Sequence, residues 1–127
     1  MSLSIDDATL LEFWRDRRLC SLTTLRPDGT PHVVPVGATL DPVAGLVRVI
    51  TSRTSRKVSY VRATPNVAVC QFEGRQWCTV EGRATVNADP AAVAEAERRY
   101  AERYRTPRPN PLRIVLEIAV TRILGSL

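Results

Sequence analysis

The chain has 127 residues, of which 44% are hydrophobic and 24% are charged, and its formal net charge is +5. This length suits one domain with a single core, and no apolar run reaches the about 18 residues that a membrane span needs. The acidic, polar N-terminus is unlike a secretory signal peptide. The basic side chains are spread from Arg15 to Arg122 and match no nucleic-acid-binding motif. We therefore expect one cytoplasmic domain over residues 1–127 that contacts neither membrane nor nucleic acid and binds a small anion.

The cysteines and the histidine give no sign of a metal site. Cys20, Cys70 and Cys78 lie in strand-like runs and form no Cys-x-x-Cys motif, and His32 is the only histidine. These spacings do not build a zinc cluster. We expect reduced thiols, as is usual for a cytoplasmic protein, and no bound metal.

The first predicted element is a helix at residues 6–17. Ser4 and Asp7 resemble a capping signal with acidic residues in the first turn, and Leu10 and Trp14 fall on one helical stripe. The pattern therefore indicates a short helix before the first strand.

Apolar and β-branched runs bounded by turn residues predict six strands. The expected strands are residues 19–25, 31–40, 46–51, 67–72, 77–86 and 113–124. Pro27-Asp28-Gly29 favours a tight turn after the first strand, because proline presets φ and glycine adopts the left-handed conformation. Gly82 predicts a bulge or a close backbone contact in the fifth strand. Most connections are hairpins, which indicates antiparallel pairing.

Two more helices are predicted between these strands. One begins after Thr54 and ends before Pro65, and the other begins at Asp89-Pro90, where aspartate is the cap and proline the first helical residue. Residues 105–111 contain three prolines and predict an irregular connection. Together the elements indicate a mainly β (β+α) fold, a small barrel with helices covering its ends.

A segment rich in hydroxyl and basic side chains joins the third predicted strand to the helix after it. It reads Thr51-Ser52-Arg53-Thr54-Ser55-Arg56-Lys57. A helix N-terminus offers free N–H groups and a positive dipole end, so this segment is typical of an anion site. We interpret it as a site for a phosphate-bearing cofactor. The alternative is that Thr54 or Ser55 only caps the helix and that the bases are solvated.

Five segments of the chain occur in one order and together carry a resemblance. They are Asp28-Gly29-x-Pro31-His32-Val33-Val34-Pro35-Val36, Arg48-Val49-Ile50-Thr51, Ser55-Arg56-Lys57, Pro65-Asn66-Val67-Ala68-Val69 and Val80-Glu81-Gly82-Arg83-Ala84. This set resembles the pyridoxamine 5′-phosphate oxidase-like split β-barrel family, in its flavin and deazaflavin branches, over nearly the whole chain. The resemblance implies a six-stranded antiparallel split β-barrel with short flanking helices. It also implies a homodimer with the cofactor in a groove shared by two subunits.

A further resemblance concerns the cofactor and the reaction. Residues 99–111, together with 22–26 and 48–51, resemble the deazaflavin-dependent reductases of this family. The implied cofactor is coenzyme F420, whose phosphate and carboxylate tail suits an arginine-rich groove. The implied activity is transfer of a hydride from the reduced deazaflavin to a tetrapyrrole such as biliverdin, and more generally to a small planar anionic substrate. The alternatives are an FMN-dependent oxidoreductase like pyridoxamine-phosphate oxidase, and a non-catalytic flavin- or deazaflavin-binding protein.

The resemblance also implies roles for individual residues. The expected phosphate-binding residues are Thr51, Ser52, Ser55, Arg56 and Lys57. The residues expected to approach the ring are Val34, Pro35, Val36 and Ile50. The residues expected to reach the cofactor from the partner subunit are Gln76 and Trp77, and those expected to hold the tail or substrate carboxylates are Arg105 and Arg108.

No catalytic side chain is identified by the sequence. His32 is a candidate proton donor because imidazole titrates near neutral pH, and the alternative is a structural role beside a proline. Trp77 is equally interpreted as a core residue. Tyr100 and Tyr104 are interpreted as helix-packing residues rather than as part of a cofactor site.

Overall fold

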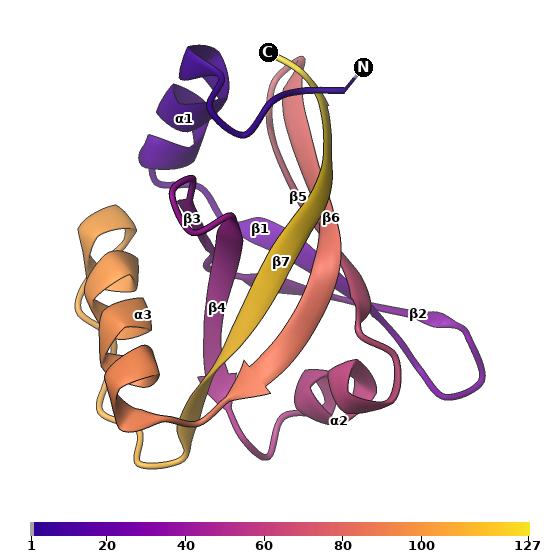
Figure 1. Ribbon diagram of the computed structural model, residues 1–127, viewed down its shortest axis with the longest axis vertical. Coiled ribbons are helices and arrows are strands. Elements are labelled where there is room, and N and C mark those ends of the chain that lie inside the picture. Colours follow the sequence, from indigo (N-terminus) through magenta and orange to yellow (C-terminus); the bar gives the residue numbers. More distant parts are fainter. Residues whose placement is uncertain (1) are drawn as a thin grey trace.

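The computed structural model describes residues 2–127 and holds one antiparallel sheet with three helices around it (Figure 1). The strands are β1 (Cys20–Leu25), β2 (Pro31–Val36), β3 (Thr39–Asp41), β4 (Leu46–Ser52), β5 (Asn66–Glu73), β6 (Gln76–Asn87) and β7 (Arg113–Ser126). The helices are α1 (Ala8–Arg15), α2 (Arg56–Ala63) and α3 (Pro90–Arg103). The mainly β, antiparallel prediction is confirmed, but the sheet has seven strands instead of six. Within residues 2–127, no helix combines the length and the apolar character needed to cross a membrane.

The extra strand arises because the predicted strand at residues 31–40 is broken at Gly37 and Ala38. The strands lie in the order β2-β1-β5-β6-β7-β4-β3, so the chain leaves one edge of the sheet at β2 and enters the other edge at β3. A Cβ atom on Gly37 would lie 2.6 Å from a ring carbon of Tyr100, so this link passes close under α3. No strand ladder joins β2 to β3 among the described residues, and the sheet is therefore not closed.

The first helix is shorter than predicted at both ends. Asp7 has an extended backbone (φ −61°, ψ 127°), and its carboxylate accepts hydrogen bonds from the N–H groups of Thr9 (2.9 Å) and Leu10 (3.1 Å). Asp7 is therefore the cap and not part of the first turn. Asp16 is again extended (ψ 143°) and ends the helix.

Several local predictions are confirmed. Gly29 has a positive φ of 87° in the turn after β1. The ladder between β6 and β7 shifts register at Gly82, where a Cβ atom would overlap the backbone oxygen of Ala119. Asp89 caps α3 and Pro90 is its first residue. These features depend on backbone preferences of single residues, which is why the sequence reveals them.

The core lies between the curved sheet and the three helices. Helix α1 contributes Leu10, Phe13 and Trp14, and α2 contributes Val58 and Val61, all buried. Helix α3 runs beside β4 and α2 covers the lower end of the sheet (Figure 1). The loop from β4 into α2 and the irregular segment after α3 are thereby brought to the same end of the molecule, where the site lies.

Candidate functional site

A pocket of about 340 Å³ lies between the ends of β2 and β4, the helix α3 and the segment before β7. We call it the basic pocket. Its lining residues are Pro35, Val36, Gly37, Ile50, Thr51, Ser52, Lys57, Tyr100, Arg105, Pro107, Arg108, Asn110 and Arg113. Eight of the predicted site residues are thus gathered here from four separate parts of the chain: Pro35, Val36, Ile50, Thr51, Ser52, Lys57, Arg105 and Arg108.

Five predicted site residues do not line the basic pocket. Val34 faces a different surface hollow, which it shares with Pro35. Ser55 and Arg56 lie at the start of α2, next to Lys57 in the chain but outside the lining. Gln76 and Trp77 begin β6, in the hairpin after β5. Trp77 is 37% exposed, so its interpretation as a core residue is wrong.

The start of α2 differs from an ordinary capped helix. Ser55 occupies the cap position with an extended backbone, as the capping alternative expected, but its side chain makes no capping hydrogen bond within residues 2–127. The hydroxyls of Ser52 and Thr54 lie 3.3 Å apart just ahead of it. The Val58 N–H donates to the Ser55 backbone oxygen (3.1 Å), but the first turn of α2 receives no acceptor from the Ser55 side chain, and an anion at this position would supply one.

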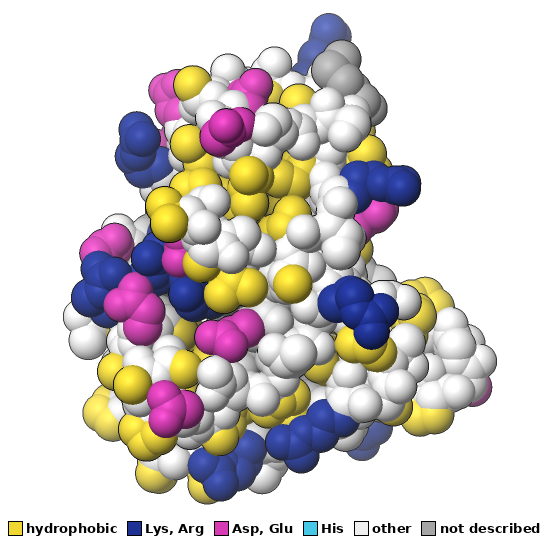
Figure 2. Space-filling model, viewed as in Figure 1, with side chains coloured by type: hydrophobic (Ala, Val, Ile, Leu, Met, Phe, Trp, Pro, Cys, Tyr) yellow, Lys and Arg dark blue, Asp and Glu magenta, His cyan; other side chains and the backbone are white. Residues whose placement is uncertain are grey.

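The basic pocket holds more positive charge than its acidic neighbours neutralise. Lys57 is half-buried, and burial lowers the pKa of its ammonium group below the usual value for lysine. Lys57, Arg105 and Arg108 form no ion pair with any acid among the described residues. Only Arg113 is paired, through Nη1 to Glu97 Oε2 at 2.7 Å. Figure 2 shows basic side chains along the lower edge of the molecule, where β4 leads into α2.

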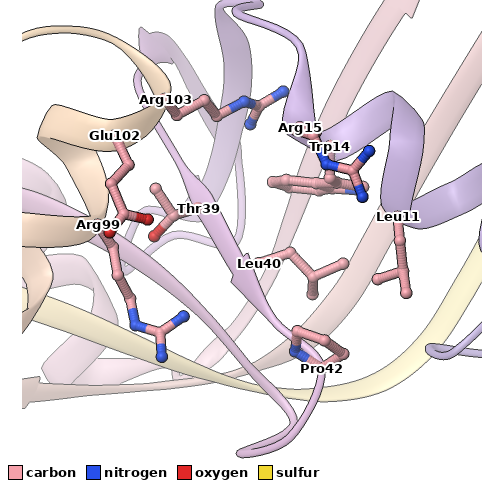
Figure 3. A pocket seen from close by; sticks show the side chains of 9 residues that line it. All are labelled: Leu11, Trp14, Arg15, Thr39, Leu40, Pro42, Arg99, Glu102 and Arg103. Carbon is pink, nitrogen blue, oxygen red and sulfur yellow. The ribbon is translucent and has the colours of Figure 1, made fainter.

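A second pocket, of about 300 Å³, lies between α1 and α3. We call it the α1–α3 seam; Figure 3 shows its lining residues, Leu11, Trp14, Arg15, Thr39, Leu40, Pro42, Arg99, Glu102 and Arg103. Unlike the basic pocket, the seam has an acid in its lining, Glu102, which contacts Arg98 (2.5 Å). Its Arg99 contacts Asp41 (3.1 Å) and Glu95 (2.7 Å). The seam therefore offers an anion less than the basic pocket does.

Asp41 is the buried acid beside the seam. Burial raises the pKa of its carboxyl, but hydrogen bonds from Arg48 and from the Ala44 N–H, with the charge of Arg99, outweigh burial and hold that pKa below its usual value. Arg48 Nη1 lies 2.8 Å from Asp41 Oδ2. The seam thus stabilises the contact between β3, β4 and α3.

Comparison with known proteins agrees with this geometry. A family model described as pyridoxamine 5′-phosphate oxidase matches residues 7–126 of the chain. The chain belongs to this family. It is 50% identical over 121 residues to the F420H(2)-dependent biliverdin reductase of Mycobacterium tuberculosis (strain CDC 1551 / Oshkosh), covering 95% of this chain and 87% of that protein.

Solved structures of low sequence identity share the fold of this pyridoxamine 5′-phosphate oxidase family member. The conserved hypothetical protein Rv2991 from Mycobacterium tuberculosis superposes with a TM-score of 0.82 at 23% identity, covering 94% of this chain and 83% of that one. A protein described as an F420 reductase superposes with a TM-score of 0.74 at 21% identity, covering 89% and 94%. These structures support the fold, and the family model and the 50% identical relative confirm the family resemblance predicted from the five segments.

Five lining residues of the basic pocket were not predicted from the sequence. They are Gly37, Tyr100, Pro107, Asn110 and Arg113. Tyr100 does pack within its helix, with its ring 4.9 Å from that of Tyr104, but it also faces the pocket. The only usable signal was the irregular segment of three prolines, whose position relative to β4 depends on the tertiary fold.

His32 lies outside the lining of the basic pocket. Its Nδ1 is 3.5 Å from the Thr24 hydroxyl, and its ring packs edge-on against Tyr60 at 5.2 Å. These contacts support the structural interpretation of His32 rather than the proton-donor one. Across residues 2–127, no three His, Cys, Asp or Glu side chains gather in a way that would hold a metal ion.

Proposed function

We propose that this protein is an oxidoreductase that uses reduced coenzyme F420 to reduce a tetrapyrrole such as biliverdin. The observation that carries the proposal is the basic pocket, whose lining includes three cations without an acidic partner in the described chain. One of them, Lys57, belongs to the first turn of α2, where the Ser55 side chain makes no capping hydrogen bond. The relative that is 50% identical is an F420H(2)-dependent biliverdin reductase, and this supports the same cofactor here.

The residues of the pocket fit the phosphate of such a cofactor. Thr51 and Ser52 offer hydroxyl donors at the end of β4, and Lys57 offers an ammonium group that has no acidic partner in the described chain. Burial disfavours the charged form of Lys57, and a phosphate next to it would favour that form again. Binding a phosphate therefore relieves an electrostatic cost that the free protein carries.

The two exposed arginines favour the deazaflavin over FMN. Arg105 and Arg108 line the pocket from the segment that follows α3, whereas Thr51, Ser52 and Lys57 line it from β4 and α2. Coenzyme F420 carries carboxylates beyond its phosphate, and a guanidinium binds a carboxylate with two hydrogen bonds. FMN has no such tail and would leave both arginines unused.

The apolar part of the pocket suits a planar ring. Pro35 is exposed at the edge strand β2, and Val36 and Ile50 present aliphatic surface beside it. When bound, the reduced cofactor supplies the hydride, and this protein supplies the wall that orients the ring and the cations that hold its anionic end. A small planar anionic substrate is expected to stack on the face of the ring that the wall leaves open.

We also propose that the protein acts as a homodimer in the cytoplasm. Leu19, Val33, Phe72 and Trp77 form an apolar patch on the β2-β1-β5-β6 side of the sheet, with exposed fractions of 67, 58, 72 and 37%. Monomers rarely leave such large side chains together in water. A partner seated there would cover the patch and bring its own Gln76 and Trp77 toward the cofactor groove. The three free thiols fit a reducing compartment.

The test of the proposed function is a side-by-side titration of the purified protein with coenzyme F420 and with FMN, followed by tryptophan fluorescence. We expect F420 to bind more tightly, and the F420-loaded protein to turn over biliverdin when the cofactor is reduced. Tighter binding of FMN would favour the alternative that the protein is an FMN-dependent oxidoreductase. Tight F420 binding without turnover of biliverdin or a related planar anion would favour the alternative that the protein binds the deazaflavin without catalysing a reaction.

A further inference from the structure

The C-terminal end of α3 holds a buried charge that has no acid to pair with. Arg103 is 8% exposed and forms no ion pair within residues 2–127. Its guanidinium donates instead to the backbone oxygens of Asp16 (3.0 Å) and Ala38 (2.6 Å) and to Gln71 Oε1 (2.6 Å). A buried cation held only by neutral acceptors is costly, so its presence calls for a role beyond filling the core.

Tyr104, the residue after Arg103, also hydrogen-bonds to the backbone of Ala38. The Tyr104 hydroxyl accepts a hydrogen bond from the Ala38 N–H (3.1 Å) and donates one to the Arg18 backbone oxygen (2.6 Å). Burial raises the pKa of Tyr104 to about 12, so the hydroxyl stays protonated and able to donate. Both backbone groups of Ala38 are thus held by the end of α3.

A third contact acts on the residue before Ala38. The Tyr100 ring lies so close to Gly37 that a Cβ atom there would be 2.6 Å from its Cε2 atom. We call Tyr100, Arg103 and Tyr104 the α3 clamp, because all three hold the link between β2 and β3. This link is the place where the sheet is not closed, so no strand ladder sets its position.

The clamped link and the clamp both continue along the chain into residues that line the basic pocket. Pro35, Val36 and Gly37 lead directly into Ala38, and Arg105 follows Tyr104 in the chain. The hydrogen bonds at Ala38 therefore connect the strand end that carries the apolar wall to the helix end that leads into Arg105.

We infer that Arg103 and Tyr104 are positioning residues, which set the apolar wall of Pro35–Gly37 and the exposed Arg105 at the spacing that the cofactor requires. This inference rests on the proposed function, since it assumes an F420-sized ligand that touches both walls at once. A preorganised pocket binds more tightly because ordering the walls does not have to occur on binding.

The test compares Tyr104→Phe, which keeps the ring and removes the hydroxyl, with Arg98→Ala. Arg98 lies on the exposed face of the same helix, where it pairs with Glu95 and Glu102. Binding of F420 is measured by tryptophan fluorescence well below the melting temperature of each variant. We expect the Kd of Tyr104→Phe to rise about three- to tenfold, the range that loss of one net hydrogen bond gives, and that of Arg98→Ala to change less than twofold.

Two further measurements separate positioning from mere stability. Hydrogen exchange of a peptide covering residues 33–40 should become faster in Tyr104→Phe, because the Ala38 N–H loses its acceptor. In Arg103→Lys, a single ammonium group replaces the guanidinium that donates to Asp16, Ala38 and Gln71. The Kd for F420 should therefore rise more in this variant than in Tyr104→Phe. If Arg103→Lys does not fold, the Kd of Tyr104→Phe for F420 is by itself the test of the inference.

A lower melting temperature of Tyr104→Phe with an F420 Kd within twofold of the parent would overturn the inference and leave the proposed function intact. If the parent protein itself does not bind F420, the proposed function fails and the inference fails with it. Those two outcomes are distinguished by the parent titration, which is run first.

Discussion

The basic pocket and the α1–α3 seam are both rich in arginine, yet they differ in how their charges are paired. In the seam, Arg99 is held by Asp41 and Glu95, and in Figure 2 acidic and basic side chains alternate along that side of the molecule. In the basic pocket, Lys57 and Arg105 have no acidic partner among the described residues. The number of arginines therefore does not distinguish the two regions. The basic pocket differs because its lining holds Lys57, Arg105, Arg108 and Arg113 but no acid.

The pKa shifts of the charged side chains also differ between the two regions. Hydrogen bonds from Arg98 and Arg99 lower the pKa of Glu95 to about 2, so the paired charges on α3 persist into strongly acidic solution. In the pocket the burial of Lys57 lowers its pKa instead, which is the sign expected of a cation without a counter-ion. The charges beside the seam therefore join elements of the fold, and those of the basic pocket are the ones that we propose bind the cofactor.

The largest effect is expected from Asp41→Ala in the seam. The substitution leaves Arg48 and Arg99 without their shared carboxylate, and breaking a buried pair costs roughly 3 kcal/mol of unfolding free energy. Chemical denaturation measures this loss. Affinity for F420 should stay within about twofold of the parent, provided the variant is assayed while folded; a large loss of affinity at full stability would contradict the division between the two regions.

The ion pairs of Asp41 also predict how the stability of the folded protein changes at acidic pH. The pKa of Asp41 is lower in the folded protein than in the unfolded chain, so its contribution to stability is present above the unfolded value, about 4, and is lost as the pH falls through the folded value. Acid denaturation of the parent should therefore show a stability loss below about pH 4 that is smaller in Asp41→Ala.

The next effect is expected from Lys57→Ala in the basic pocket. Loss of one charged hydrogen bond to the phosphate should weaken F420 binding by about 1.5–3 kcal/mol, or roughly 10- to 150-fold in Kd. Fluorescence titration measures it, with Arg98→Ala as the surface control. An affinity within twofold of the parent would show that Lys57 does not hold the phosphate.

A smaller effect is expected from pH on the parent protein. Binding requires the charged form of Lys57, whose pKa is lowered in the free protein and should be raised again by the ligand. Affinity is then complete below the free-protein pKa and declines as the pH rises through it, at a lower pH than an ordinary lysine would give. Titration from pH 7 to about 10 tests this, and Lys57→Arg should remove the decline because guanidinium stays charged.

The smallest effect is expected from the cysteines. Burial raises the pKa of Cys20, and it raises that of Cys78 to about 11, so neither thiol is ionised near neutral pH. Cys20→Ser, Cys70→Ser and Cys78→Ser should therefore turn over substrate at the parent rate wherever they remain folded. A folded but inactive serine variant would reveal thiol chemistry in the reaction.

The features that the sequence revealed are those that depend on a few neighbouring residues. Asp89 and Pro90 start α3, and Gly29 and Gly82 take the turn and the bulge that their conformational freedom predicts. The hydroxyl and basic segment around Lys57 was also recognisable, because a strand, a polar turn and a helix start follow one another directly in the chain.

The features that only the tertiary structure decided depend on contacts between distant residues. Arg103 and Ala38 are 65 positions apart, and nothing near Gly37 in the chain indicates that the strand breaks there to pass under Tyr100. The order of strands places β2 and β3 at opposite edges, and the fold brings Arg105 to the pocket that residues of β4 and α2 also line. Local preferences act over a few residues, whereas the walls of the site are set by side chains that meet only when the sheet curls around its core.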